Sequence, residues 1–215
     1  DEDIYGPTFF KRNFGWAVEN GLLTDYKVIV LALDEAVVSK HAEISLKEGS
    51  ELGLDDATKL IGCYKALAKI GIEESEDSTA NDPMKRAIAF CQNIALSKAT
   101  QDEFGHFVNQ YLDEESKETG EEKPELSVSI KHVDGTFNAK EREECLSWLK
   151  DDVEEQACRI LTNARCLSEG VDVPSLDAIM FLHPRKSVID VVQSVGRVMR
   201  RADNKKLGYV ILPIA

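Results

Sequence analysis

The 215-residue sequence contains no apolar run near the roughly 20 residues that a membrane-spanning helix needs, and it has no visible signal peptide. Its five cysteines are scattered without a CxxC pair, and its four histidines are dispersed without metal-ligand spacing. These absences argue against a membrane protein, a disulfide-stabilised secreted protein and a zinc module. We therefore expect a reduced, cytoplasmic protein. The chain begins without methionine, which is expected of a segment of a longer protein.

Two nucleotide-binding motifs are also missing. No GxxxxGK[ST] phosphate loop occurs in the sequence, so the chain lacks the usual cradle for the phosphates of a nucleoside triphosphate. The segment LALDEAV, which follows residues 27–30, contains no glycine-rich turn. A doubly wound nucleotide- or cofactor-binding enzyme, such as a transferase, would need that turn, so this class is a weak alternative.

Positive charge is scarce overall but concentrated near the C-terminus. The formal net charge is −13. Residues 159–206 nevertheless contain nine Lys or Arg against five Asp or Glu, whereas residues 1–158 contain seventeen against thirty-four. Because the local field matters more than total charge for attracting a polyanion, the overall acidity does not exclude a nucleic-acid partner.

Short apolar segments alternate with amphipathic segments along the chain. The apolar segments predict strands at 26–33, 86–91, 126–133, 158–162, 178–182 and 207–212. The amphipathic segments predict helices at 9–20, 55–70, 93–112, 139–149 and 187–201. This alternation predicts an α/β fold with a parallel sheet covered by helices on both faces, and with ligands at the carboxyl ends of the strands. We expect the first strand to be buried on both faces.

Two regions interrupt this alternation. Residues 34–85 are interpreted as an excursion, because their first part has weak periodicity and their last part is polar and acidic around the 55–70 helix. Residues 113–125 contain seven acids, two lysines and no apolar residue, so we predict an exposed acidic linker there.

The most informative stretch is SVIDVVQSVGRVMRR, residues 187–201. On a helix, one stripe at i, i+3, i+4 and i+7 would contain Gln193, Gly196, Arg197 and Arg200. An opposite stripe, predicted to face the core, would contain Val188, Val191, Val192, Val195 and Met199. Two guanidinium groups one turn apart, with no acid between them, suit a polyanion such as a phosphate. A solvated basic surface would have the same pattern.

A second set of polar residues follows the predicted strand 158–162. Thr162 and Asn163 end this strand and offer a hydroxyl, an amide and backbone N–H groups to a phosphate. Gly170 permits a close backbone approach, and Asp172 presents a carboxylate, although an ordinary loop explains Gly170 equally well. The order of this loop and the 187–201 helix makes the two segments more informative together than either is alone.

This order of segments resembles the second RecA-like lobe of superfamily 2 helicases and translocases. TNARCLSEGVDVPSLDAIMFL is similar to helicase motif V, and QSVGRVMRR is similar to motif VI, whose expected form is Q-x-x-G-R-x-x-R. RAIAFC is similar to motif IV and HVDGT to the loop after the next strand, while FGWAVENGLLTDYKV resembles the segment that joins the lobes of restriction-enzyme motors. The resemblance implies an inter-lobe segment at 1–25 and a RecA-like domain at 26–215.

The resemblance also implies roles for individual residues. Arg200 would be the arginine finger at the γ-phosphate, Arg197 a second phosphate contact and Gln193 an orienting amide. The nucleotide-binding and coupling positions would be Gly170, Asp172 and Gly196. The path of one strand's phosphates would be lined by Thr162, Asn163, Cys91, Gln92, Gly135 and Thr136. An ordinary turn explains Asp134-Gly135 slightly better than this role, and we expect His132 and His183 to be structural.

The family has its phosphate loop and its magnesium-binding DEAD or DEAH box on the first lobe, and DEDIYG at residues 1–6 is not such a box. The resemblance therefore implies half of an ATP site, with ATP and Mg²⁺ bound mainly by an absent N-terminal RecA-like lobe. The chain alone should not hydrolyse ATP, since phosphoryl transfer needs the cradle, the metal and the finger together. The implied function is ATP-dependent translocation on nucleic acid, more specifically on double-stranded DNA.

The alternative is a non-motor nucleotide- or nucleic-acid-binding module that kept the fold. The intact Q-x-x-G-R-x-x-R pattern argues against the loss of the motor function in such a module. The motor hypothesis requires Arg197 and Arg200 to lie at an open cleft. It would fail if these side chains pointed into the apolar interior or were capped by the chain's own carboxylates on a closed surface.

Overall fold

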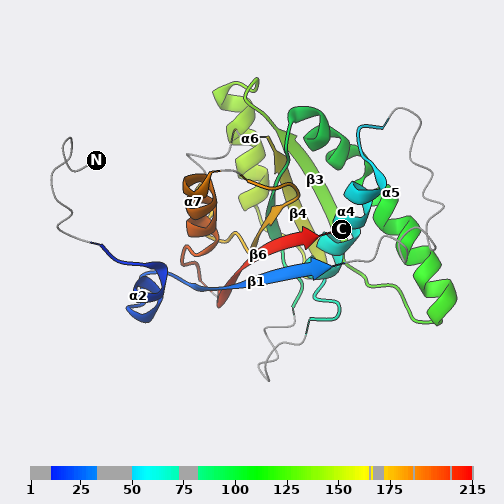
Figure 1. The fold of residues 1–215 in the computed structure, drawn as a ribbon, viewed down its shortest axis with the longest axis horizontal. Coiled ribbons are helices and arrows are strands. Elements are labelled where there is room, and N and C mark those ends of the chain that lie inside the picture. The colour runs from blue at the N-terminus through cyan, green and yellow to red at the C-terminus, as the bar shows by residue number, and fades with distance from the viewer. Residues whose placement is uncertain are drawn as a thin grey trace.

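Six parallel strands form one sheet in the computed structural model, which describes residues 11–32, 50–72, 82–164, 166, 172–185, 187–203 and 205–214 (Figure 1). The strands are β1 (Asp25–Ala32), β2 (Arg86–Phe90), β3 (Ser127–Val133), β4 (Ala157–Asn163), β5 (Ala178–Phe181) and β6 (Leu207–Ile214). Their order across the sheet is β1-β6-β5-β2-β4-β3, and every pair is parallel. All six predicted strands are confirmed, with small shifts at their ends.

Side chains alternate across the sheet and build one apolar core on each face. In β2, Ala87 and Ala89 pack on one face, whereas Ile88 and Phe90 pack on the other. The same alternation continues through β5 and β6. Because both faces of these central strands are buried, their sequences are almost continuously apolar.

Helices cover both faces of the sheet. α4 (Leu54–Leu67) and α5 (Ile94–Thr119) pack on one face, whereas α6 (Ala139–Lys150) and α7 (Val188–Val198) pack on the other (Figure 1). The short helix α2 (Phe14–Glu19) contacts α7. None of the described helices combines the length and the apolar character that crossing a membrane requires. The three-layer α/β/α arrangement confirms the predicted fold class.

Four of the described helices, α2, α5, α6 and α7, begin with a side chain that caps the first turn. Asn93 Oδ1 accepts from the backbone N–H of Leu96 at 2.8 Å, and Asn138 Oδ1 accepts from that of Glu141 at 3.0 Å. Ser187 caps α7 in the same way. These bonds satisfy N–H groups that have no partner inside a helix, so α5, α6 and α7 start at defined residues.

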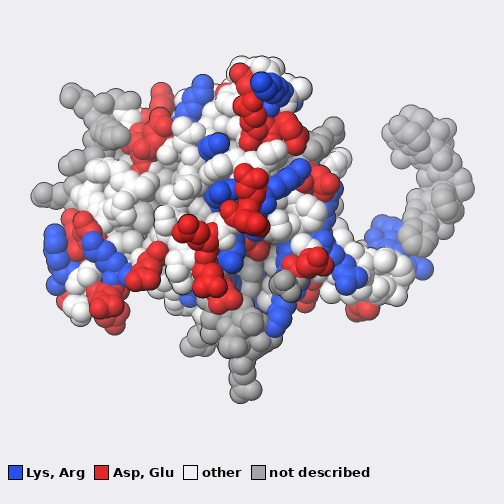
Figure 2. Space-filling view, turned by 180° about the vertical axis from the view of Figure 1, so that it is seen from behind, with Lys and Arg blue, Asp and Glu red and all other residues white. Residues whose placement is uncertain are grey.

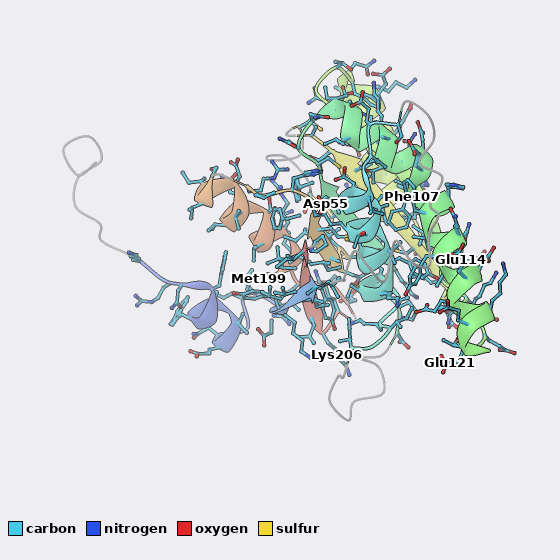
Figure 3. All side chains as sticks on the ribbon, turned by 45° about the vertical axis from the view of Figure 1, so that its right-hand side comes forward. Asp55, Phe107, Glu114, Glu121, Met199 and Lys206 are labelled. Atoms are coloured by element: carbon cyan, nitrogen blue, oxygen red, sulfur yellow. The ribbon has the colours of Figure 1, made fainter. Side chains whose placement is uncertain are left out.

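The predicted acidic linker at 113–125 is wrong in its first half. Residues 113–119 continue α5, which ends at Gly120 in the left-handed conformation with φ 71°. Lys65 of α4 donates to Glu115 Oε1 at 2.8 Å and to Tyr111 Oη at 2.9 Å. Composition does not reveal such contacts between helices. Figure 3 shows this end of α5 extending beyond the sheet.

The helix predicted at 55–70, within the 34–85 segment, is confirmed as α4. α4 is a core helix, with Leu60, Ile61 and Leu67 buried against the sheet. Residues 33–49 and 73–81 lie outside the described residues. The helix predicted at 9–20 is confirmed from Phe14 onward, where α2 begins. The role of the segment 1–25 in joining two lobes stays a prediction.

β1 lies at the edge of the sheet, so the prediction that it is buried on both faces is wrong. Ile29 and Leu31 pack against the core on the face of α4, whereas Val28 and Val30 are about half exposed, at 50% and 57%. An apolar pattern identifies a strand, but it does not say whether a helix covers both of its faces.

Candidate functional site

α7 exposes a different side from the one predicted. Its exposed side comprises four residues, three of them apolar: Val188, Ile189, Val192 and Gln193. Its buried side includes Val195 and Val198, which pack against the sheet. The predicted core positions of Val188 and Val192 are therefore wrong. Apolar residues occur around much of this helix, so periodicity alone could not identify the buried side.

Arg197 and Gly196 are less accessible than an exposed stripe would require. Arg197 lies on the buried side of α7 and is 8% exposed, so the predicted stripe is wrong for this residue. A Cβ at Gly196 would lie 3.9 Å from the ring of Phe14 in α2. The N-terminal helix therefore covers part of the surface beside the arginines.

Arg200 lies beyond the end of α7, because the helix ends at Val198 and Met199 is its C-cap. Helical periodicity therefore does not set its orientation. Its Nη1 pairs with Asp172 Oδ1 at 2.5 Å, and the two side chains are 42% and 75% exposed. The ion pair joins two residues to which the sequence assigned parts of one nucleotide site.

This pair bears directly on the predicted arginine finger. A carboxylate of the chain itself neutralises Arg200, but exposed ion pairs of this kind contribute only about 0–1 kcal/mol to stability. A phosphate can therefore replace Asp172 at small cost. Of the two guanidinium groups, Arg200 meets the requirement for access and the buried Arg197 does not. Gly170 lies outside the described residues.

The strand residues predicted to line a phosphate path are buried. Thr162 and Asn163 end β4 and are 0% exposed, and Cys91 just after β2 is also buried. Thr162 Oγ1 donates to Ser97 O at 3.0 Å, and Asn163 Nδ2 donates to Ala89 O at 3.1 Å. We therefore correct the prediction for these three residues, because they lie inside the domain and their polar side chains connect its elements.

Three other predicted nucleic-acid residues are exposed at the carboxyl edge of the sheet: Gln92, Gly135 and Thr136. Gln92 follows β2, the other two follow β3, and β4 lies between these strands. The backbone N–H and the hydroxyl of Thr136 both donate to Asp134 Oδ1, at 2.7 and 2.5 Å. Phosphate contacts of Gln92 and Gly135 stay predictions, whereas the donors of Thr136 are engaged within the loop.

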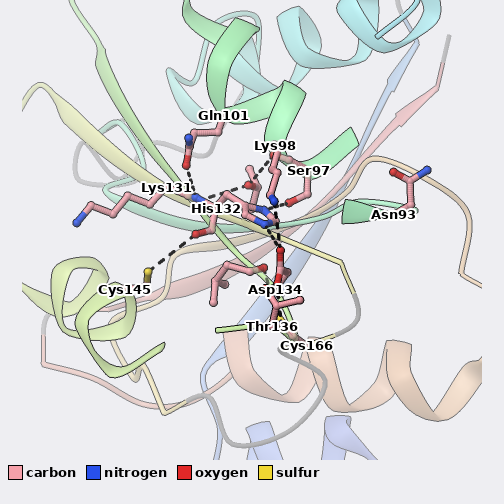
Figure 4. A network of polar contacts seen from close by, with 12 residues as sticks. Asn93, Ser97, Lys98, Gln101, Lys131, His132, Asp134, Thr136, Cys145 and Cys166 are labelled. Atoms are coloured by element: carbon pink, nitrogen blue, oxygen red, sulfur yellow. Dashed lines mark hydrogen bonds and ion pairs between the residues drawn. The ribbon is translucent and has the colours of Figure 1, made fainter. Parts of the chain in front are cut away.

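Asp134 belongs to a buried polar network beside this edge (Figure 4). His132 Nε2 lies 2.9 Å from Asp134 Oδ2, and His132 Nδ1 lies 2.7 Å from Ser97 Oγ. Hydrogen bonds from Thr136 and His132 hold the pKa of Asp134 well below its usual range. An ionised carboxylate can only accept a hydrogen bond, so Nε2 of His132 donates to Asp134.

The residue types Ser97, His132 and Asp134 match those of a hydrolase triad, but the network is not a hydrolytic site. Ser97 is 0% exposed, so no substrate can reach its hydroxyl. Its carbonyl accepts from Thr162, so the network joins β3, β4 and α5. The structural role predicted for His132 is confirmed. His183 similarly contacts Asp56, with 3.3 Å between Nε2 and Oδ1.

Charge does not outline a site by itself. Within the described part of the chain, no group of three or more His, Cys, Asp or Glu side chains could hold a metal ion. On the face opposite that of Figure 1, basic and acidic side chains are interspersed (Figure 2). That face therefore has no uniform positive patch.

Sequence reasoning missed two residues that contact the backbone around Arg200. Lys205 Nζ donates to the carbonyl oxygens of Arg200 and Pro174, each at 3.1 Å. The backbone N–H of Thr24 donates to Met199 O at 2.8 Å. A lysine in the polar segment DNKK is typical of a surface, and Thr24 is distant in sequence, so neither contact has a signal in the sequence.

Residues 65–202 match the helicase conserved C-terminal domain. The match extends from α4 past the end of α7 and covers more than half of the chain. The chain therefore belongs to this family of helicase C-terminal domains, and its identification as a superfamily 2 lobe is confirmed.

Two solved structures extend this result. The chain is 37% identical to a structure described as the ATP-dependent Type ISP restriction-modification enzyme LlaBIII bound to DNA, with a TM-score of 0.82 over 99% of this chain and 13% of that one. A fragment assigned as the HsdR subunit of a type I restriction enzyme from Vibrio vulnificus YJ016 has a TM-score of 0.55 at 20% identity, over 99% of this chain and 36% of that one. The second likeness supports the fold alone.

Two viral proteins assigned as helicases are similar over shorter segments. The protein of Sulfolobus islandicus filamentous virus is 30% identical over 96 residues, which are 45% of this chain and 16% of the viral protein. The protein of African swine fever virus is 40% identical over 55 residues, which are 26% of this chain and 6% of the viral protein. The chain thus spans a small part of the length of these relatives.

Proposed function

We propose that this chain is the second motor lobe of an ATP-dependent translocase that acts on double-stranded DNA. Arg200 would contact the γ-phosphate of an ATP molecule bound mainly by a first RecA-like lobe. Membership of the helicase C-terminal domain family supports the motor role. The likeness to LlaBIII, whose structure is described as ATP-dependent and bound to DNA, supports the choice of ATP and DNA.

The ion pair between Arg200 and Asp172 is the observation that carries the proposal. It joins the segments that resemble motifs V and VI, and both side chains are accessible. A surface guanidinium that pairs with an exposed carboxylate can exchange that carboxylate for a phosphate, which matches its planar fork in a bidentate way. Because Arg197 is buried in this structure, we propose no phosphate contact for it here.

In the proposed cycle, the two lobes close and Arg200 exchanges Asp172 for the γ-phosphate. Its guanidinium then stabilises the charge that develops during phosphoryl transfer. Bound ATP supplies the phosphoryl group, and its Mg²⁺ neutralises phosphate charge. The described residues contain no cluster of metal ligands, so the first lobe would hold this ion. Asp172, once released, can accept a hydrogen bond from the ribose.

Opening of the lobes after hydrolysis would return Arg200 to Asp172. The DNA contacts of this lobe would then move relative to those of the first lobe, which gives a step. Gln92 and Gly135, exposed at the carboxyl edge of the sheet, are the proposed contacts to one strand's phosphates. Contacts of this kind should weaken steeply with added salt, because phosphate binding releases counterions.

The test is the Arg200→Ala substitution in the full-length protein. DNA-stimulated ATP turnover should fall roughly 10³-fold or more, as it does when an arginine finger is removed. The melting temperature should change little, because an exposed ion pair contributes little stability.

Arg201→Ala is the matched control, since it removes the same charge from the next residue. Arg201 Nη1 donates to Gly21 O at 2.6 Å, and this variant should keep most of the turnover. Full turnover of Arg200→Ala would remove Arg200 from the ATP site and contradict the proposed function.

A further inference from the structure

The backbone of Arg200 is held by α7, whose Arg197 O accepts from the Arg200 N–H at 3.2 Å, and also by contacts from outside this helix. The helix ends at Val198, so Arg200 is not part of its regular hydrogen-bond ladder. The carbonyl oxygen of Arg200 accepts from Lys205 Nζ at 3.1 Å and from Thr24 Oγ1 at 3.4 Å. A lysine side chain that binds carbonyls at the C-terminal end of a helix is electrostatically favourable.

The same ammonium group also contacts the segment that contains Asp172. Lys205 Nζ donates to the carbonyl oxygen of Pro174, two residues after Asp172, at 3.1 Å. One cation therefore connects the two backbone segments whose side chains form the Arg200–Asp172 pair. Small displacements matter here, because a misplacement of about 1 Å in a catalytic group can cost about 10²-fold in rate.

Lys205 is partly buried, and both its burial and the nearby charged groups affect its pKa. Burial lowers its pKa to about 8, and the opposite charge of Asp177 only partly offsets this effect. The Asp177 carboxylate accepts from the backbone N–H groups of Lys85 and Arg86 at 2.9 Å, and the charge of Arg86 is also near it. The charge of Lys205 is thus lost in the alkaline range, whereas an ordinary lysine keeps its charge there.

We infer that Lys205 is a positioning residue for Arg200: its ammonium group clamps the carbonyl oxygens of Arg200 and Pro174 and so sets where the guanidinium meets the nucleotide. This inference rests on the proposed function, since it assumes that Arg200 acts on a phosphate. It adds a residue that lies outside the segments resembling motifs V and VI. Lys205 itself touches neither ATP nor DNA in this account.

The test compares three variants of the full-length protein. Lys205→Met should lower kcat for DNA-stimulated ATP hydrolysis about 10- to 100-fold and leave KM for ATP nearly unchanged, because Arg200 acts mainly in the transition state. Lys206→Met is the matched control: this neighbouring lysine is exposed, and its loss should change kcat less than twofold. Arg200→Ala is measured in parallel.

The pH profile separates positioning from a purely structural role. In the wild type, kcat should decline as pH rises through about 8, because the clamp loses its charge-assisted hydrogen bonds. Lys205→Arg keeps its charge at this pH and should shift that decline to higher pH. This second variant also keeps the inference testable if Lys205→Met fails to fold.

Each outcome has a distinct meaning. A wild-type kcat for Lys205→Met, with Arg200→Ala strongly impaired, would overturn the inference and leave the proposed function intact. An unchanged decline near pH 8 in Lys205→Arg would also overturn it. Full activity of Arg200→Ala would instead overturn the proposed function, and the inference with it.

Discussion

Two aspartates in loops that follow neighbouring strands differ in almost every physical respect. Asp134, after β3, is 0% exposed and accepts hydrogen bonds from His132 and Thr136. Asp172, in the segment after β4, is exposed and pairs with Arg200 at the surface. The carboxylate of Asp134 is engaged in hydrogen bonds inside a buried network. The carboxylate of Asp172 faces solvent and can exchange its partner. The difference separates a carboxylate that holds the domain together from one that is available for function.

The contrast predicts a large loss of stability when the buried carboxylate is removed. Asp134→Ala leaves the buried ring of His132 and the donors of Thr136 without their acceptor. We expect the free energy of unfolding to fall by about 3 kcal/mol. Urea unfolding of the 215-residue chain measures this change. A loss below about 1 kcal/mol would show that the network contributes no more than a surface pair.

Acid should reveal the same network. The pKa of Asp134 is lower in the folded chain than in the unfolded chain, chiefly because Thr136 and His132 donate to its carboxylate. The contribution of Asp134 to the free energy of unfolding is therefore complete at pH values above its pKa in the unfolded chain, about 3.9. This contribution is lost as the pH falls below that pKa toward the pKa in the folded chain. Asp134→Asn should flatten the decline in stability below about pH 4. An identical acid limb in both proteins, followed by circular dichroism, would contradict this assignment.

Removal of the exposed carboxylate should have the smallest effect on stability. Asp172→Asn breaks the pair with Arg200, yet we expect less than about 1 kcal/mol of change in the free energy of unfolding. The same urea titration measures it, with Asp134→Asn as the buried counterpart. A loss as large as that of the buried aspartate would mean that Asp172 is fixed in the structure and does not exchange partners.

The sequence predicts the sheet well and the surfaces poorly. β2, β5 and β6 are found from their apolar runs, because strands buried on both faces leave a continuous pattern. β1 has the same pattern at the edge of the sheet, so Val28 and Val30 were wrongly expected to be buried. α5 continues through 113–119, where Lys65 of another helix binds Glu115, and no local pattern reports this contact.

The candidate site was predicted in its residue types but not in its geometry. Asp172 and Arg200 were assigned to one site from their motifs, and the structure pairs them. Helical periodicity placed Arg197 and Arg200 on one exposed stripe, but α7 ends before Arg200 and turns Arg197 toward the interior. The contacts of Lys205 depend on tertiary structure, so they could not be inferred from sequence spacing.

The proposed mechanism requires Arg200 to leave Asp172 for a nucleotide phosphate. It is tested most directly by the structure of the full-length protein with DNA and a non-hydrolysable ATP analogue. We expect the Arg200 guanidinium to lie within hydrogen-bond distance of the γ-phosphate and its pair with Asp172 to be broken. An Arg200 that stays paired with Asp172, while the analogue is bound between closed lobes, would contradict it.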